Sequence, residues 1–112
     1  MAAMKTALQP GEVVVRVGPA NLARGWEAAG GQLTLTNQRL VFEAHRFNLQ
    51  THATLIDLSA VTGLEPCWTK LFNLIPLAPN SLAVRTASAE FRFVLHAREA
   101  WRRDIDAARG NG

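Results

Sequence analysis

The stretch that decides the fold is residues 30–45, GGQLTLTNQRLVFEAH. It opens with two glycines and then alternates apolar with polar side chains in two runs, separated by Asn37 and Gln38. Such alternation is typical of half-buried strands, and a two-residue polar break between two alternating runs is typical of a tight turn. The stretch therefore predicts a β-hairpin with strands at about 31–36 and 39–44. The inward-facing side chains expected from the alternation are Leu33, Leu35, Leu40 and Phe42.

Shorter runs rich in β-branched and aromatic residues surround the hairpin and predict five more strands. Residues 20–30, interrupted by Gly25, read as a loop, and Pro79-Asn80 reads as a turn. The last strand is expected to bury Phe91 and Phe93. The five further strands are expected at 12–17, 53–58, 61–65, 81–86 and 89–95.

The pattern changes to a helical period after the last strand. Between Arg98 and Arg109, the apolar residues Trp101, Ile105 and Ala108 recur at i, i+4 and i+7. The apolar stripe of this helix needs a surface to cover, and the open end of a strongly bent sheet supplies one. The sequence thus predicts an α+β fold: a seven-stranded, partly open antiparallel barrel capped by one C-terminal α-helix.

The same residues carry a family resemblance. Residues 30–45 read Gly-Gly-x-Leu-x-Leu-Thr-x-x-Arg-Leu-x-Phe-x-x-His, and the chain continues with the pattern Ile-x-Leu-x-x-Val at 56–61 and Pro-Asn-x-Leu-x-Val at 79–84. It ends with Trp-Arg-Arg-Asp-Ile at 101–105. In this order and spacing the motifs resemble the GRAM domain, a branch of the pleckstrin-homology-like (PH-like) folds. The resemblance implies a PH-like barrel used as a lipid- or protein-binding module.

Length and composition are those of a single globular domain. The chain has 112 residues and a formal net charge of +3, and arginine supplies ten of its twelve basic side chains. We expect a flexible lead-in at 1–10, one domain at 11–109 and a short tail at 110–112. The single cysteine, Cys67, excludes an internal disulfide and fits a reducing compartment. The chain offers neither a signal peptide nor a membrane span, which favours a cytoplasmic location.

One candidate site is an anionic-ligand site at the rim of the barrel. In PH-like folds the loops after the first, third and sixth strands meet at one rim. In this chain that rim would carry an arginine beside an aromatic ring, a combination that suits a phosphate at a membrane interface. The alternative is that the aromatic ring folds over the barrel and the arginines face water. The candidate residues are Arg24, Trp26, His45, Arg46 and His52.

A second candidate is the apolar stretch 68–77, bounded by prolines. It is more apolar than a solvated loop should be. It could form a helical or hairpin excursion packed on the body of the domain or across a homodimer, or it could be an exposed patch for a partner or a bilayer. The candidate interface residues are Trp68, Leu71, Phe72, Leu74 and Ile75.

Enzymatic function is disfavoured because no catalytic or phosphate-cradling motif is present. The spacing of His45, His52 and Cys67 fits no known metal-ligand pattern, so no metal, catalytic residue or cofactor is expected. Nucleic-acid binding is disfavoured because no strand face interleaves aromatic with basic side chains. The sequence therefore favours a non-enzymatic binding module for a protein partner or an anionic membrane surface, with a homo-oligomeric interaction protein that binds no lipid as the alternative.

Overall fold

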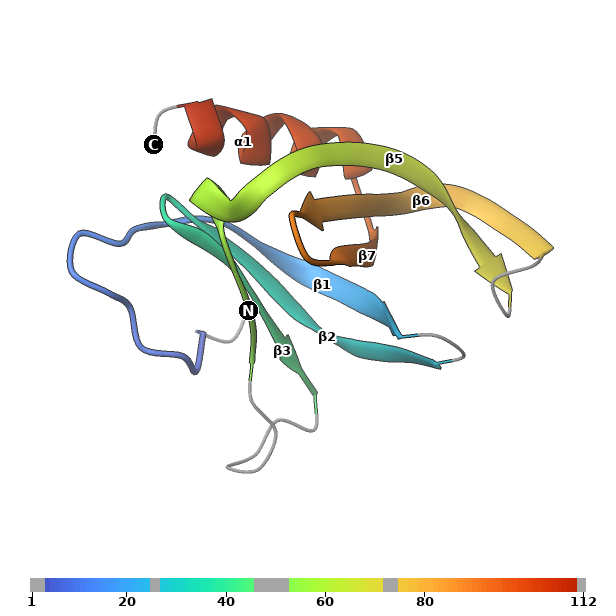
Figure 1. The fold of residues 1–112 in the computed structure, drawn as a ribbon. Helices are drawn as coiled ribbons and strands as arrows, with labels where there is room; N and C mark the ends of the chain where they lie inside the picture. Colours follow the sequence, from blue (N-terminus) through green and yellow to red (C-terminus); the bar gives the residue numbers. More distant parts are fainter. Residues whose placement is uncertain (1–3, 25–26, 46–52, 72–74, 111–112) are drawn as a thin grey trace.

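The computed structural model describes residues 4–24, 27–45, 53–71 and 75–110, and it describes no side chains at 24, 27, 68–71 and 75–79. Seven strands precede one helix (Figure 1). The elements are β1 (Val14–Arg24), β2 (Glu27–Thr36), β3 (Arg39–Ala44), β4 (Thr54–Asp57), the 3-10 turn η1 (Leu58–Ala60), β5 (Val61–Leu71), β6 (Ile75–Thr86), β7 (Glu90–Leu95) and α1 (Arg98–Gly110).

All seven strands belong to one antiparallel sheet in the order β4-β3-β2-β1-β7-β6-β5. The β2–β3 hairpin has the predicted register, with Leu33 opposite Phe42 and Leu35 opposite Leu40. β1 meets β7 over only three residue pairs, from Ala20 to Leu22. Figure 1 shows the two halves of the sheet turning across each other at this narrow contact. Among the described residues the two end strands, β4 and β5, do not pair, so the bent sheet stays open and the predicted fold class is confirmed.

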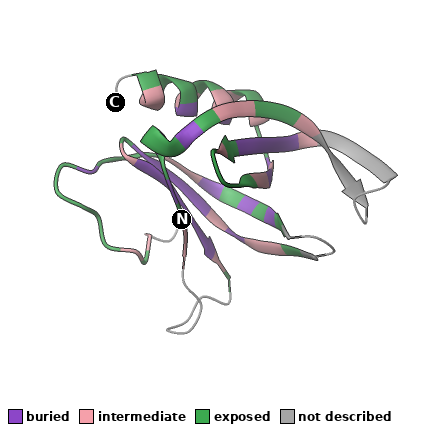
Figure 2. Cartoon of the chain, viewed as in Figure 1, coloured by how far each residue is buried: buried purple, intermediate pink, exposed green. Residues whose placement is uncertain are grey.

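The core lies inside this bend (Figure 2). Phe42 and Phe93 come from opposite halves of the sheet, and their ring centroids are 5.9 Å apart in a tilted arrangement. The predicted core is confirmed, since Leu33, Leu35 and Leu40 are buried with them, while Phe91 is partly buried against the cluster.

Helix α1 covers the open end of the bend with its predicted stripe. Trp101 and Ile105 are buried, and the Trp101 ring packs against Gly18 of β1, where a Cβ would lie 3.3 Å from the indole. The helix also protects the exposed edge of β5, because Arg98 and Arg109 donate hydrogen bonds to the carbonyls of Cys67 and Val61, both at 3.1 Å.

Part of the N-terminal segment, residues 5–12, contacts the sheet. The backbone N–H groups of Lys5 and Thr6 donate to the Glu43 carboxylate on the outer face of β3, at 3.0 and 2.7 Å. The chain then turns at Gly11, which has a φ of 75°. This turn places Glu12 against Thr36 and Arg39 of the β2–β3 hairpin. These hydrogen bonds attach residues 5 and 6 to β3, and the composition of the N-terminal residues does not reveal them.

Glu12 and Arg39 form a buried ion pair under this segment, with 0% and 5% of their side chains exposed. Arg39 Nε donates to Glu12 Oε2 at 2.8 Å and Arg39 Nη2 to Oε1 at 3.0 Å, while the Thr36 hydroxyl donates to Oε2 at 2.7 Å. The guanidinium of Arg39, aided by Thr36, lowers the pKa of the Glu12 carboxyl to about 2, although burial opposes the shift. The arginine of the hairpin motif thus pins the N-terminal segment to the sheet.

Two local predictions were wrong. Residues 20–24 and 27–30 extend β1 and β2 instead of forming a loop, because pairing with neighbouring strands outweighs the low strand propensity of the glycines. Pro79 and Asn80 lie within β6, not in a turn. The register between β5 and β6 shifts at this point, and a proline without an N–H is tolerated at such an irregularity.

Candidate binding surface at one end of the sheet

The direction of the strands brings three connections to one end of the sheet. Because neighbouring strands alternate in direction along the sheet order, β1, β3 and β6 all run the same way. The β1–β2, β3–β4 and β6–β7 connections therefore leave the hydrogen-bonded sheet at the same end. This is the rim at which the sequence places its anionic-ligand candidates.

The candidates differ in how far the structure describes them. Arg24 is the last residue of β1 and pairs with Glu27 across the β1–β2 connection, but its side chain lies outside the described part. Trp26, Arg46 and His52 lie outside the described residues altogether. His45 is described, and it is exposed directly after β3. The rim site as a whole stays a prediction.

His45 lies across β2 from Asn21. Its backbone N–H donates to the Gly30 carbonyl at 2.9 Å, and Asn21 of β1 pairs with Gly30 from the other side. A Cβ on Gly30 would lie 3.0 Å from Asn21 Oδ1 and 3.3 Å from His45 Cδ2. The missing side chain at Gly30 therefore leaves room for the carboxamide and the imidazole over the β2 backbone.

The next glycine has a different role. A Cβ on Gly31 would collide with the carbonyl oxygen of Glu43 and lie 2.8 Å from Ala44 Cα. Here the backbones of β2 and β3 approach too closely for any side chain. In the glycine pair that opens the hairpin motif, Gly31 thus allows the backbones of β2 and β3 to approach closely, and Gly30 leaves room for the side chains of Asn21 and His45.

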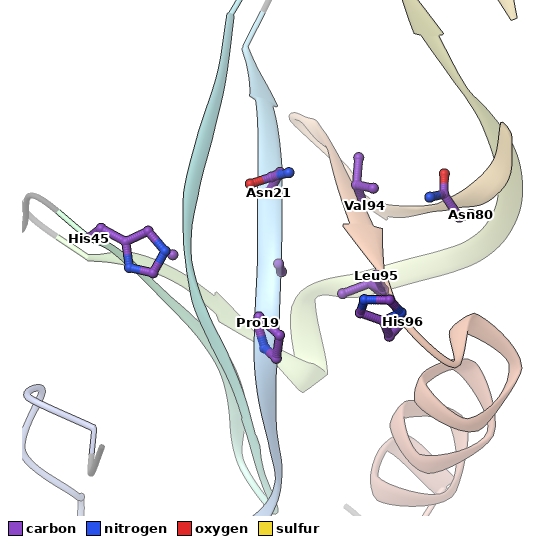
Figure 3. A pocket seen from close by; sticks show the side chains of 9 residues that line it. Pro19, Asn21, His45, Asn80, Val94, Leu95 and His96 are labelled. Carbon is purple, nitrogen blue, oxygen red and sulfur yellow. The ribbon is translucent and has the colours of Figure 1, made fainter. Parts of the chain in front are cut away.

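A shallow cavity of about 210 Å³ extends from His45 across β1 to β7 (Figure 3). His45 and His96 lie on opposite sides of it, with Pro19 and Asn21 of β1 between them. None of its lining residues, all in the described part of the chain, carries a carboxylate. The lining residues are Pro19, Ala20, Asn21, Gly31, His45, Asn80, Val94, Leu95 and His96.

Sequence reasoning did not single out Asn21, Asn80 or His96. The sequence predicts a loop around Asn21 and a turn at Asn80, and therefore indicates no outward direction for their side chains. His96 comes directly after β7. On that strand Arg92 and Val94 alternate with the inward-facing Phe93 and Leu95, and continuing this alternation by one residue predicts that His96 faces outward.

Most described arginines already have acidic partners. Arg92 and Arg85 both donate to Glu90, at 2.8 and 2.9 Å, and these bonds lower the pKa of the Glu90 carboxyl. A second chain of ion pairs runs along the exposed face of α1. The first set consists of Glu65, Arg85, Glu90 and Arg92, and the second of Glu99, Arg102, Asp106 and Arg109.

The apolar candidates fall on the β5–β6 hairpin. Phe72 and Leu74 lie outside the described residues, and the side chains of Trp68, Leu71 and Ile75 are likewise not described. The backbone on both sides of the tip is strand, which favours the hairpin alternative over the helical one. β7 pairs with β6 only between Ser81 and Arg85, so the hairpin extends beyond β7, as Figure 1 shows.

Within the described ranges, no three His, Cys, Asp or Glu side chains come together as a metal site. Cys67 is partly buried on β5, and burial raises the pKa of its thiol. No helix in the described part of the chain is long and apolar enough to cross a bilayer.

No protein-family model and no curated protein matches the chain. Solved structures do match it. The C-terminal domain of an unknown protein from Leishmania infantum superposes with a TM-score of 0.72 at 13% identity, over 89% of this chain and 86% of that one. The Vps36 N-terminal PH domain gives 0.64 at 14% identity, over 90% and 84%. The human ARAP2 N-terminal PH domain gives 0.66 at 12% identity, over 96% and 87%. The chain therefore has a PH-like fold.

Proposed function

We propose that this chain is a non-enzymatic binding module of the GRAM type that contacts an anionic membrane surface with the β1–β2, β3–β4 and β6–β7 end of its sheet, as a peripheral protein of the cytoplasm. The observation that supports it best is that the strand order brings the β1–β2, β3–β4 and β6–β7 connections, two of which carry an arginine, to one end of the sheet. The GRAM motif at residues 30–45 and the PH-like fold are compatible with this use but do not by themselves specify a ligand.

Two arginines belong to the connections at this end of the sheet. The acidic residue nearest to them in the strand register is Glu27, which pairs with Arg24 across the β1–β2 connection. Arg24 ends β1 and Arg46 follows β3 by two positions, both at the proposed contact end.

An arginine pair with a neighbouring indole suits the chemistry of a lipid head group. A guanidinium can donate two parallel hydrogen bonds to a phosphate, and tryptophan prefers the membrane interface. Two basic residues are fewer than the four to eight that mark strongly polybasic lipid contacts, so the binding is expected to be weak and dependent on salt.

Vesicle co-sedimentation tests the proposal. The double variant Arg24→Ala/Arg46→Ala removes two positive charges at the contact end. The matched control, Arg102→Ala/Arg103→Ala, removes two charges from the exposed face of α1. Phosphatidylcholine vesicles with phosphatidylserine should retain the wild type and the control at low salt, whereas the first variant should lose binding with its fold intact by circular dichroism.

The outcomes separate the candidates. Binding that survives the Arg24→Ala/Arg46→Ala change, or an equal loss in both double variants, would contradict a specific contact at the strand ends. Failure of the wild type to bind phosphatidylserine vesicles at any salt concentration would remove the membrane proposal and leave a protein partner as the ligand.

A second candidate function rests on the β5–β6 hairpin. Its arms beyond Ser81 pair only with each other among the described strands, and their sequence is strongly apolar. We propose that, if no lipid binds, this hairpin joins two copies of the chain. Multi-angle light scattering of the wild type measures this directly, and a monomer at all accessible concentrations would exclude it.

A further inference from the structure

We propose that the outer face of the β2–β3 hairpin binds an extended peptide segment of a partner protein, and that residues 5–9 of this chain, the N-terminal arm, occupy the site when the partner is absent. Binding there requires neither Arg24 nor Arg46, so it goes beyond the membrane contact proposed above. The site, called the outer site below, is formed by Thr34 of β2 and by Arg39, Val41 and Glu43 of β3.

The outer site holds the arm chiefly by its backbone. At one end, the Glu43 carboxylate accepts the backbone N–H groups of Lys5 and Thr6, at 3.0 and 2.7 Å, and the Thr6 hydroxyl at 2.7 Å. At the other end, Arg39 Nη2 donates to the Ala7 carbonyl at 2.9 Å. Because these bonds are made largely to main-chain groups, an extended peptide of another sequence can form the same ones.

The arm buries little of its own surface. Ala7, Leu8 and Gln9 are exposed, and Leu8 has 52% of its surface in contact with solvent. A turn joins the arm to the sheet, in which the Glu12 N–H donates to the Gln9 carbonyl at 3.0 Å and Gly11 has the positive φ noted above. A segment with exposed side chains that is held by a few hydrogen bonds opens at a low cost in free energy, so the arm can leave the outer site while the sheet stays folded.

The middle of the outer site contains a polar group that the arm leaves unsatisfied. Val41 lies between Arg39 and Glu43 along the outward phase of β3, and Thr34 pairs with Val41 across the hairpin. Val41 is 0% exposed and Thr34 is 1% exposed, yet Thr34 Oγ1 has no hydrogen-bond partner among the described residues. A buried hydroxyl without a partner costs free energy. A partner peptide that places a polar side chain beside Thr34 removes this cost, which favours replacement of the arm by the partner.

The arm and the partner peptide compete for the same hydrogen-bonding groups. A segment tethered by a short turn has an effective concentration of the order of millimolar, so the arm keeps weakly binding peptides out of the outer site. A change that weakens the arm and leaves the outer site intact should therefore make the site accessible to a peptide added in solution.

Thr6→Pro is such a change, because proline lacks both the N–H and the hydroxyl that Thr6 donates to Glu43. The probe is a capped synthetic peptide with the sequence of residues 4–9, Met-Lys-Thr-Ala-Leu-Gln, added to the full chain and followed by ¹H–¹⁵N NMR. It should shift the amide resonances of Thr34, Val41 and Glu43 in the Thr6→Pro variant, and should bind this variant at least about tenfold more tightly than the wild type.

The matched control is Gln9→Ala. This change lies in the same arm and alters an exposed side chain, but it keeps every backbone group that the arm uses. The affinity of the probe for Gln9→Ala should therefore equal its affinity for the wild type.

Three further peptides test the role of Thr34, each with asparagine in place of the residue at position 7, 8 or 9. One of them should bind the Thr6→Pro variant about two- to tenfold more tightly than the native sequence does, which is the gain expected from one neutral hydrogen bond. This gain should disappear when Thr34→Val is combined with Thr6→Pro, because valine has a similar shape but no hydroxyl.

Equal affinity of the probe for the wild type and Thr6→Pro, no binding to Thr6→Pro, or shifts centred away from the outer site would each overturn the proposal. The same holds if no asparagine peptide gains affinity, or if the gain persists in Thr34→Val. If Thr6→Pro proves unfolded, hydrogen exchange in the wild type decides the question: the amides of Lys5 and Thr6 should exchange much faster than that of Val41, and equal rates would show that the arm does not open independently of the sheet.

Discussion

Replacing Glu12 by glutamine tests the buried ion pair that joins the N-terminal segment to the sheet. The Glu12 carboxylate accepts hydrogen bonds from Arg39, from the Thr36 hydroxyl and from the Gln9 backbone N–H, and its side chain is 0% exposed. Glutamine keeps the shape but removes the charge, which leaves the Arg39 guanidinium buried without a counterion. Breaking one side of a buried pair typically costs about 3–5 kcal/mol.

The pKa of Glu12 gives an independent magnitude. It falls from 4.5 to about 2 in the folded protein, chiefly because Arg39 donates to the carboxylate. At about 1.4 kcal/mol per pH unit, this shift is worth at most about 3 kcal/mol, and residual hydration of the pair reduces it. Because the folded pKa is the lower one, the contribution is complete above about pH 4.5 and is lost as pH falls toward about 2.

Urea denaturation at a series of pH values between 7 and 2 is the assay. The wild type should lose stability steeply below about pH 4.5, whereas Glu12→Gln should start about 3–5 kcal/mol lower at neutral pH and show a shallower slope in this range. The control Glu99→Gln alters an exposed carboxylate on α1 and should change stability by less than about 0.5 kcal/mol. Equal acid slopes for the wild type and Glu12→Gln would refute this reasoning.

Three further substitutions test other parts of the structure. Trp101→Ala should lower the free energy of unfolding by about 3–5 kcal/mol because it leaves a cavity between α1 and the sheet, while Leu55→Ala on the exposed face of β4 should cost little. Equal melting temperatures for Trp101→Ala and the wild type would show that the helix does not cap the sheet. Gly31→Ala should destabilise by at least about 1–3 kcal/mol because its Cβ meets the Glu43 carbonyl, whereas Gly63→Ala should be nearly neutral in the same urea titration. Phe72→Asp should leave the melting temperature of the monomer nearly unchanged and shift any dimer to monomer in light scattering if the hairpin is an interface; a Phe72→Asp variant that unfolds would place this residue in the core.

The sequence predicted those parts of the fold that depend on local periodicity. Alternation in residues 30–45 is sufficient to pair Leu33 with Phe42, since the pleat of a strand sends every second side chain to the core. The stripe through Trp101 and Ile105 similarly predicted the helix and its buried face. These signals are strong because a strand or helix that buries one face carries apolar residues at a regular interval along the sequence.

The sequence could not predict contacts that depend on distant pairing. The end of β1 and the start of β2 are strands because they pair with each other, from Ala20 opposite Gly31 to Arg24 opposite Glu27, although the glycines give them low strand propensity. The Glu12–Arg39 pair joins residues separated by two strands, and neither residue alone indicates burial. For the same reason His45 could be proposed from its place at the end of a strand, whereas its alignment with Asn21 became evident only from the register.

The most direct test of the proposed membrane contact is residue-level NMR mapping with bicelles that contain phosphatidylserine. We predict that the amide resonances perturbed on binding belong to the ends of β1, β3 and β6 and their connections, residues 24–27, 45–52 and 86–90, while those of α1 remain unchanged. Perturbations centred on α1 or on residues 68–77, with the three connections unaffected, would contradict the proposal that this end of the sheet is the binding surface.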